Sequence, residues 1–201
     1  MRDAQQPLTS KQIEIADAAL RIIGERGIAS LTTASLTQEL GVSSGAPFRH
    51  FASREEILEA AAQRVAEMVA STYPDASLPP LERLRALFFA RVKTVGKRAG
   101  VTRFIFSEQF ALALPPAAVE RMLDLVRGTR AFVLQALKEG MEQGEIRKDL
   151  SPKALLPIVL GSLQHLVFLS ALPSGLGKTP MATEVFASLT CLLTPFPERS
   201  R

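Results

Sequence analysis

Residues able to bind an anion gather in one short stretch, VSSGAPFRHF, at positions 42–51. Its small residues let a backbone come close to another molecule, and Arg49 and His50 can donate hydrogen bonds to phosphate oxygens. Positions 40–54 contain no Asp or Glu, although they hold Arg49, His50 and Arg54. This local charge pattern predicts contact with a phosphate-bearing partner such as a nucleic acid.

The neighbouring sequence predicts the helices that position this stretch. Apolar side chains at helical spacing over residues 13–23 predict a first helix. A second, short helix is predicted over residues 33–40, because Thr32 is a good N-cap and Gly41 can adopt the left-handed conformation that ends a helix. A third is expected over residues 43–51, since a proline in the first turn loses little. Such a pair of helices with a tight turn predicts a helix-turn-helix.

The rest of the sequence predicts more helices and no strand. Segments with helical periodicity or helix-start signals follow over residues 53–73, 81–95, 104–110, 115–140, 152–172 and 180–194, with breaks near 74–80 and 99–100. We therefore expect an all-α fold of about nine helices, with a small N-terminal unit and a larger C-terminal bundle.

Composition narrows the class of protein. With 47% apolar residues in 201, the chain can bury a substantial core, and its net charge of +4 is a weak indicator of an anionic partner. One cysteine excludes an intramolecular disulfide, and we expect Cys191 to be a small buried hydrophobe in a protein of the reducing cytoplasm.

The sequence contains only incomplete versions of the motifs that are typical of enzymes and nucleotide-binding proteins. The run GLGKT at 175–179 is similar to the end of a phosphate-binding loop, but Leu172 stands where that motif needs a glycine. Two distant histidines and one cysteine provide neither metal-ligand spacing nor a nucleophile with its base. We expect no enzyme activity, no metal and no cofactor.

Residues from about 13 to 58 resemble, without a gap, the DNA-binding domain of the tetracycline-repressor (TetR) family of bacterial transcription regulators. The resemblance covers about a quarter of the chain. Its most specific elements are Gly27, Thr32, Leu36, the turn at 41–43, Gly45, the run at 48–51 and residues 53–55.

The resemblance implies a set of DNA contacts. Thr33 and Ala34 would lie near the DNA backbone. The residues that would face the major groove or its phosphates are Ser44, Gly45, Ala46, Pro47, Arg49, His50 and Arg54. Phe48 stands where the family usually has tyrosine, so its ring can pack against the sugar-phosphate surface but lacks a hydroxyl for the phosphate. Other interpretations remain open for His50, as a capping or packing residue, and for Arg49, as a solvated charge.

The uncharged run at 154–177 is long enough to suggest a membrane span. Pro157, Gly161, Gln164 and His165 favour instead a helix buried in a large core or at a subunit interface. Helices near 152–172 and 180–194 from two chains would form a four-helix bundle, which is also the usual dimer arrangement in the resembling family.

The resemblance further implies that the C-terminal region binds a small effector. Pockets for such ligands are mostly apolar and hold a few polar groups. The candidates are Phe88, Phe104, Phe110 and Phe168 as lining aromatics, with Arg91, Arg103, Gln164 and His165 as orienting groups. Their composition suggests an apolar or amphipathic effector, such as one with an acyl chain.

Together these observations predict a homodimeric, ligand-responsive repressor that an effector releases from a palindromic operator. Residues 1–54 would form the DNA-binding domain and residues 55–201 the effector-binding and dimerisation domain. An architectural DNA-binding protein that docks a protein partner remains an alternative, which an exposed apolar groove would favour. A helical enzyme or carrier is a further alternative, and it would need a convergent catalytic site.

Overall fold

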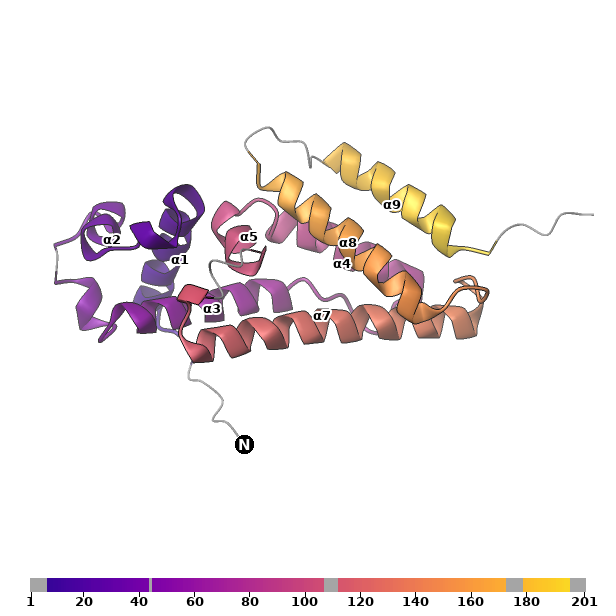
Figure 1. Cartoon of the computed structure of the whole chain (residues 1–201), viewed down its shortest axis with the longest axis horizontal. Coiled ribbons are helices and arrows are strands. Elements are labelled where there is room, and N and C mark those ends of the chain that lie inside the picture. The colour runs from indigo at the N-terminus through magenta and orange to yellow at the C-terminus, as the bar shows by residue number, and fades with distance from the viewer. Residues whose placement is uncertain (1–6, 44, 107–111, 173–178, 196–201) are drawn as a thin grey trace, which may run out of the picture. The chain divides into compact units, whose positions relative to one another are not determined.

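The computed structural model describes residues 7–43, 45–106, 112–172 and 179–195 (Figure 1). In these residues it contains eight α-helices, two 3₁₀ turns and no strand, which confirms the all-α prediction. The α-helices are α1 (Ser10–Arg26), α2 (Thr33–Leu40), α3 (Arg54–Ala70), α4 (Pro80–Thr94), α5 (Ala99–Phe106), α7 (Pro116–Gln143), α8 (Pro152–Ser170) and α9 (Thr179–Leu193). The 3₁₀ turns are η1 (Ile28–Ser30) and η2 (Pro47–Arg49).

Local capping chemistry sets the ends of the first two helices. A capping box begins α1, because the Thr9 hydroxyl accepts a hydrogen bond from the Gln12 amide while the Gln12 side chain accepts one from the Thr9 amide. Thr32 caps α2 in the same way through Ser35. Gly41 ends α2 with a left-handed φ of 65°, as predicted.

Contacts divide the chain into two compact units, each described here by itself. The first consists of Met1–Met68 and Arg98–Leu123, so it includes α5 although this helix follows α4 in the sequence. Within it, α1 packs against both α2 and α5. Its large, fully buried side chains include Ile15, Ile22, Leu36, Ile57 and Leu58. The sequence boundary at residues 54 and 55 stays a prediction.

Two glycines allow α1 and α5 to touch. A Cβ atom on Gly100 would lie 1.8 Å from the Leu20 carbonyl oxygen, and one on Gly24 would lie 2.4 Å from the Gly100 amide nitrogen. The helices break at residues 95–98, directly before the predicted position near 99–100, and Gly100 is the second residue of α5. At this position the backbones of α1 and α5 pack so closely that only a residue without a side chain fits.

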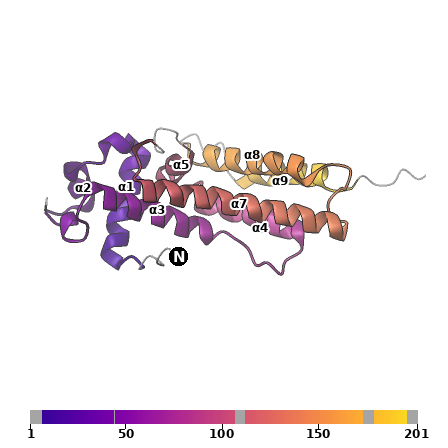
Figure 2. The ribbon, with the colours of Figure 1, turned by 60° about the horizontal axis from the view of Figure 1, so that its bottom comes forward.

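The second unit consists of Val69–Lys97 and Asp124–Arg201. Here α4 contacts both α8 and α9, and Figures 1 and 2 show α8 and α9 side by side and antiparallel. An ion pair between Arg83 and Glu139 joins α4 to α7. The Phe88 ring of α4 meets the Phe186 ring of α9 edge to face, with 5.3 Å between the ring centroids.

Replacing Gly100 by alanine should lower the free energy of unfolding by about 3 kcal/mol or more, because the new Cβ would overlap the Leu20 backbone. Gly128→Ala is the matched control, since the nearest atom to a Cβ on that exposed glycine of α7 is 3.6 Å away. The control should raise the free energy of unfolding by about 0.5–1 kcal/mol. Urea unfolding followed by circular dichroism measures both, and a Gly100→Ala protein as stable as wild type would contradict the tight helix crossing.

Candidate DNA interface and effector site

The segment after α2 forms a series of short turns in place of the predicted helix over residues 43–51. The amide of Ala46 donates to the Ser43 carbonyl over 3.0 Å, and that of His50 donates to the Pro47 carbonyl over 3.1 Å. These bonds span three residues, as in a 3₁₀ turn. Pro47 has no amide to donate and Gly45 favours helices poorly, so a full α-helical ladder is not formed. Ser44 lies outside the described residues.

This segment presents basic and aromatic side chains to solvent. Phe48, Arg49 and His50 are exposed, and the Arg49 side chain makes no hydrogen bond or ion pair with any described residue. Gly45 is exposed and Ala46 is half-buried. Thr33 and Ala34, at the start of α2, are exposed as well.

Pro47 is buried, which corrects the prediction that its ring faces the major groove. A buried ring cannot contact a base edge, so its role in this conformation is packing. Phe51 is also buried and fixes the end of the turn in the core of the first unit. The turn is further attached to α1, because the Gln12 side-chain amide donates to the His50 carbonyl over 3.3 Å.

The Arg54 side chain donates hydrogen bonds to backbone carbonyls of its own unit. Its Nε donates to the Leu31 carbonyl and its Nη2 to the Ile28 carbonyl, both over 2.9 Å. Nη1 alone has no hydrogen bond with a described residue, so a phosphate contact through that atom stays a prediction. The observed bonds give Arg54 a structural role, since they tie the start of α3 to the first residue of η1 and to the residue directly after η1.

The acidic groups that flank this surface have partners. Glu39 accepts a hydrogen bond from Arg21 of α1 over 2.6 Å, and Glu56 accepts one from the Ala52 amide over 2.7 Å. Hydrogen bonds from its own backbone amide and from Ser53 lower the pKa of Glu55, so it is ionised at neutral pH. The cation of Arg49 therefore has no carboxylate bound to it within the described residues.

Arg54→Met should lower the free energy of unfolding by about 2–4 kcal/mol, because two carbonyls lose charge-assisted hydrogen bonds. Arg49→Met, at an exposed and unpaired side chain, should change it by less than about 0.5 kcal/mol. Both variants should bind DNA more weakly, but Arg49→Met should keep the wild-type stability. Chemical unfolding and fluorescence anisotropy with a labelled duplex separate the two effects, and an Arg54→Met protein of unchanged stability would rule out the structural role.

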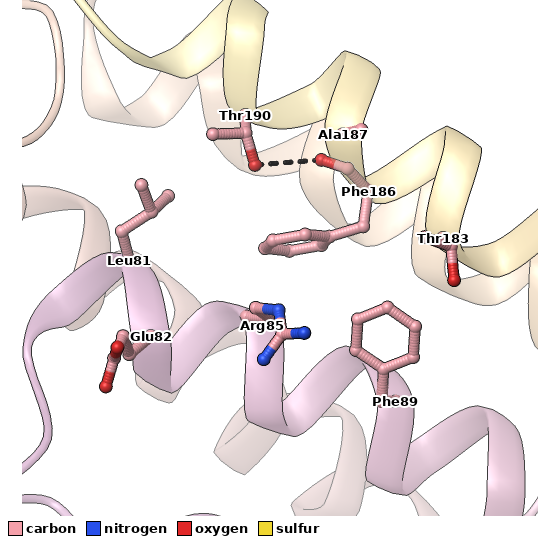
Figure 3. A pocket seen from close by; sticks show the side chains of 8 residues that line it. All are labelled: Leu81, Glu82, Arg85, Phe89, Thr183, Phe186, Ala187 and Thr190. Carbon is pink, nitrogen blue, oxygen red and sulfur yellow. Dashed lines mark hydrogen bonds between the residues drawn. The ribbon is translucent and has the colours of Figure 1, made fainter.

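In the second unit, α4 and α9 border an open groove of about 430 Å³ (Figure 3). Apolar side chains from both helices form most of its surface, with Phe186 and Phe89 pointing into the space between the helices. The Arg85 guanidinium lies 5.3 Å from the centre of the Phe89 ring. The lining residues are Leu81, Glu82, Arg85, Phe89, Thr183, Phe186, Ala187 and Thr190. None was predicted from the sequence, although 81, 85 and 89 share one face of α4 through their spacing.

Arg91 occupies a different side of the same unit. The side chain is buried, with 7% of the residue exposed, and its Nε donates to the Thr72 hydroxyl over 2.8 Å. Its guanidinium carbon lies 5.5 Å from the centre of the Tyr73 ring. The Tyr73 hydroxyl shares a hydrogen bond of 2.9 Å with the Thr129 hydroxyl of α7. Burial lowers the pKa of Arg91, which is nevertheless charged at neutral pH.

The other predicted effector residues lie in different environments. Gln164, His165 and Phe168 of α8 are exposed, so they do not line an enclosed pocket of a single chain. Phe88 is buried against Phe186. Arg103 is exposed and Phe104 buried on α5, which belongs to the first unit. Phe110 lies outside the described residues.

Large apolar side chains of α8 and α9 are exposed, next to the exposed Gln164 and His165 of α8. Phe168 is 47% exposed and Leu192 is 57% exposed, and Ile158 is exposed on the same side of α8 as Phe168. Cys191 is exposed too, which corrects its predicted burial. Length and composition alone would allow α8 to span a membrane, and one third of that apolar window is buried.

Comparison with known proteins finds one family in both parts of the chain. Residues 15–61 match the model described as bacterial regulatory proteins, tetR family, and residues 77–167 match the tetracyclin repressor-like C-terminal domain. The HTH-type transcriptional repressor KstR2 of Mycobacterium tuberculosis is 27% identical over 146 residues, which cover 71% of this chain and 72% of KstR2.

Solved structures share the fold. The structure of the ketosteroid transcriptional regulator KstR2 of Mycobacterium tuberculosis has a TM-score of 0.77 at 22% identity, covering 97% of this chain and 100% of that one. AibR, in complex with isovaleryl coenzyme A and operator DNA, has a TM-score of 0.72 at 16% identity, covering 93% and 100%. With two family models matched along the sequence and the same all-α fold, this chain belongs to the TetR family of bacterial regulatory proteins and is a DNA-binding transcription regulator.

Proposed function

We propose that this protein is a homodimeric repressor that leaves a palindromic operator when a small effector binds its C-terminal unit. The observation that supports DNA binding most directly is the exposed turn at residues 45–50, with Arg49 unpaired among the described residues. Two such turns, spaced about 34–36 Å apart by a dimer, would enter successive major grooves. Bound effector would favour a dimer in which this spacing no longer fits. Repression agrees with the description of KstR2 as a repressor.

The dimer is proposed to form through α8 and α9. Large apolar side chains on their outer face would be covered by the same face of a second copy, giving a four-helix bundle. Gly161 lies on this face of α8, and a Cβ there would meet no atom of its own chain within 4 Å. A glycine at that position lets a partner helix approach closely. The apolar character of α8 is thereby explained without a membrane.

An apolar or amphipathic effector is the class we propose. The second unit contains a cluster of rings formed by Phe88, Phe89 and Phe186, and its open groove has the volume of ordinary ligand pockets. The names of the similar structures mention a ketosteroid regulator and isovaleryl coenzyme A. For this chain we propose only the broad class of apolar or amphipathic effectors. We do not propose a ketosteroid or isovaleryl coenzyme A itself. A protein partner in the open groove is the alternative that its shape favours.

We further propose that the protein is a regulator without enzyme activity and that it works in the cytoplasm. Both family models describe regulatory proteins, and the proposed operator is part of bacterial DNA. The domain limits at residues 54 and 55 are retained as part of this proposal, with DNA binding on the N-terminal side.

Phe168→Glu should weaken dimerisation by about 100-fold or more, because it would bury a charge without a partner at the α8–α9 interface. Val126→Glu is the control, since Val126 is 52% exposed on α7, outside that face. Sedimentation equilibrium should find a dimer for wild type and the control, and mostly monomer for Phe168→Glu. A Phe168→Glu protein that remains dimeric would exclude this interface.

Selection from random DNA duplexes tests the function itself. The wild-type protein should enrich an inverted repeat, and its affinity should fall steeply with salt because bound phosphates release counterions. In Arg49→Met the logarithmic salt slope should become shallower by about two units for a dimer, one for each lost phosphate contact. No enrichment by a folded dimer at low salt would refute the proposed function.

A further inference from the structure

Two arginines of α4 are buried, and they differ in how their charge is balanced. Arg83 pairs with the Glu139 carboxylate of α7, and this hydrogen bond is the main cause of a lowered Glu139 pKa. Arg91 has no carboxylate within ion-pairing distance among the described residues. Its Nη2 is inaccessible to solvent and has no hydrogen-bond partner in the part of the chain described, whereas in Arg83 the inaccessible nitrogen without a partner is Nε. An uncompensated buried cation costs stability, so its presence calls for a counterion.

The groups around Arg91 hold it in one orientation. The Thr72 hydroxyl donates its proton to the Val69 carbonyl over 2.5 Å, so it can only accept from Arg91 Nε. Tyr73 lies under the guanidinium and packs against Phe132, with 5.1 Å between the ring centroids. The guanidinium is therefore prepositioned before any ligand binds.

A second donor lies in the same cluster. Tyr73 and Thr129 share one hydrogen bond but carry two hydroxyl protons, so one proton remains for another acceptor. Both residues are half-buried. Gly128 beside them is exposed and has no side chain to cover the Tyr73 hydroxyl, which lies 3.6 Å from where a Cβ would stand.

We propose that Arg91 is the anion-recognising residue of the effector site, and that the effector is a carboxylic acid with an apolar body. The charge of one carboxylate balances the charge of the guanidinium, and two parallel N–H groups of the guanidinium match the two carboxylate oxygens. The remaining hydroxyl proton of Tyr73 or Thr129 provides a further donor. The rings of Tyr73 and Phe132 provide apolar surface for the part of the ligand next to the carboxylate. This inference rests on the proposed function, because it names the chemical class of the effector.

The test uses the full-length protein and a series of unbranched carboxylates from acetate to tetradecanoate, each paired with its neutral methyl ester and its coenzyme A thioester. Thermal unfolding and titration calorimetry measure binding. Wild type should be stabilised by at least one acid and should prefer it to the ester by about 10- to 100-fold, the value of one charge-assisted contact. Preference for the thioester, or no response to any acid, would overturn the proposal.

Variants of Arg91 separate recognition from structural support. Arg91→Gln keeps a donor for Thr72 but removes the charge, so it should lose the preference for acid over ester. Arg91→Lys should keep most of it. Lys93→Gln is the control, because Lys93 is an exposed cation of α4 that lines neither the groove nor the Arg91 cluster, and it should behave as wild type. An Arg91→Gln protein that keeps the preference, or an Arg91→Lys protein that loses it, would contradict the proposal.

Failure of this inference can be told from failure of the proposed function. A wild-type protein that selects an operator but ignores every acid remains a DNA-binding regulator with a different class of effector. A protein that binds acid through Arg91 but selects no DNA would instead retain the inferred site and lose the proposed function.

Discussion

The close crossing of α1 and α5 is the constraint on which the N-terminal unit depends. Because Gly24 and Gly100 have no side chains, the two backbones meet, and α1 is buried along much of its length. α1 in turn carries Asp17, which pairs with Arg64 of α3 over 3.1 Å, and Gln12, which holds the exposed turn. The proposed DNA-reading surface is thus built on a helix that is also held by α5, which follows the helix-turn-helix in the sequence.

Local signals were sufficient for the ends of α2. Thr32 and Gly41 begin and end this helix through chemistry that involves only neighbouring residues, so the sequence alone predicted them. Gly100 could not be interpreted in this way. A glycine that breaks a helix and one that lets two helices touch have the same local pattern, and only the partner helix, distant in sequence, distinguishes them.

The exposure of the charged and polar residues of the candidate DNA interface could be predicted from the sequence. The burial of its apolar residues could not, because it depends on tertiary packing. Arg49 and His50 are exposed as expected, whereas the burial of Pro47 depends on the core beneath it. α8 is apolar on nearly every side, so periodicity did not show which face is inward, and the exposure of Gln164 and His165 could not be predicted. Arg91 was identified as a polar group in an apolar region, but its partner Thr72, before α4, carried no signal.

Gln12 performs two tasks with one side chain. Its Oε1 accepts from the Thr9 amide at the start of α1, while its Nε2 donates to the carbonyl of His50 in the exposed turn. Fraying of the first turn of α1 would therefore also break a hydrogen bond that holds the proposed DNA-reading turn, so the two segments are coupled. A ligand that immobilises the turn, such as an operator, consequently slows amide hydrogen exchange at the start of α1, a region it need not touch.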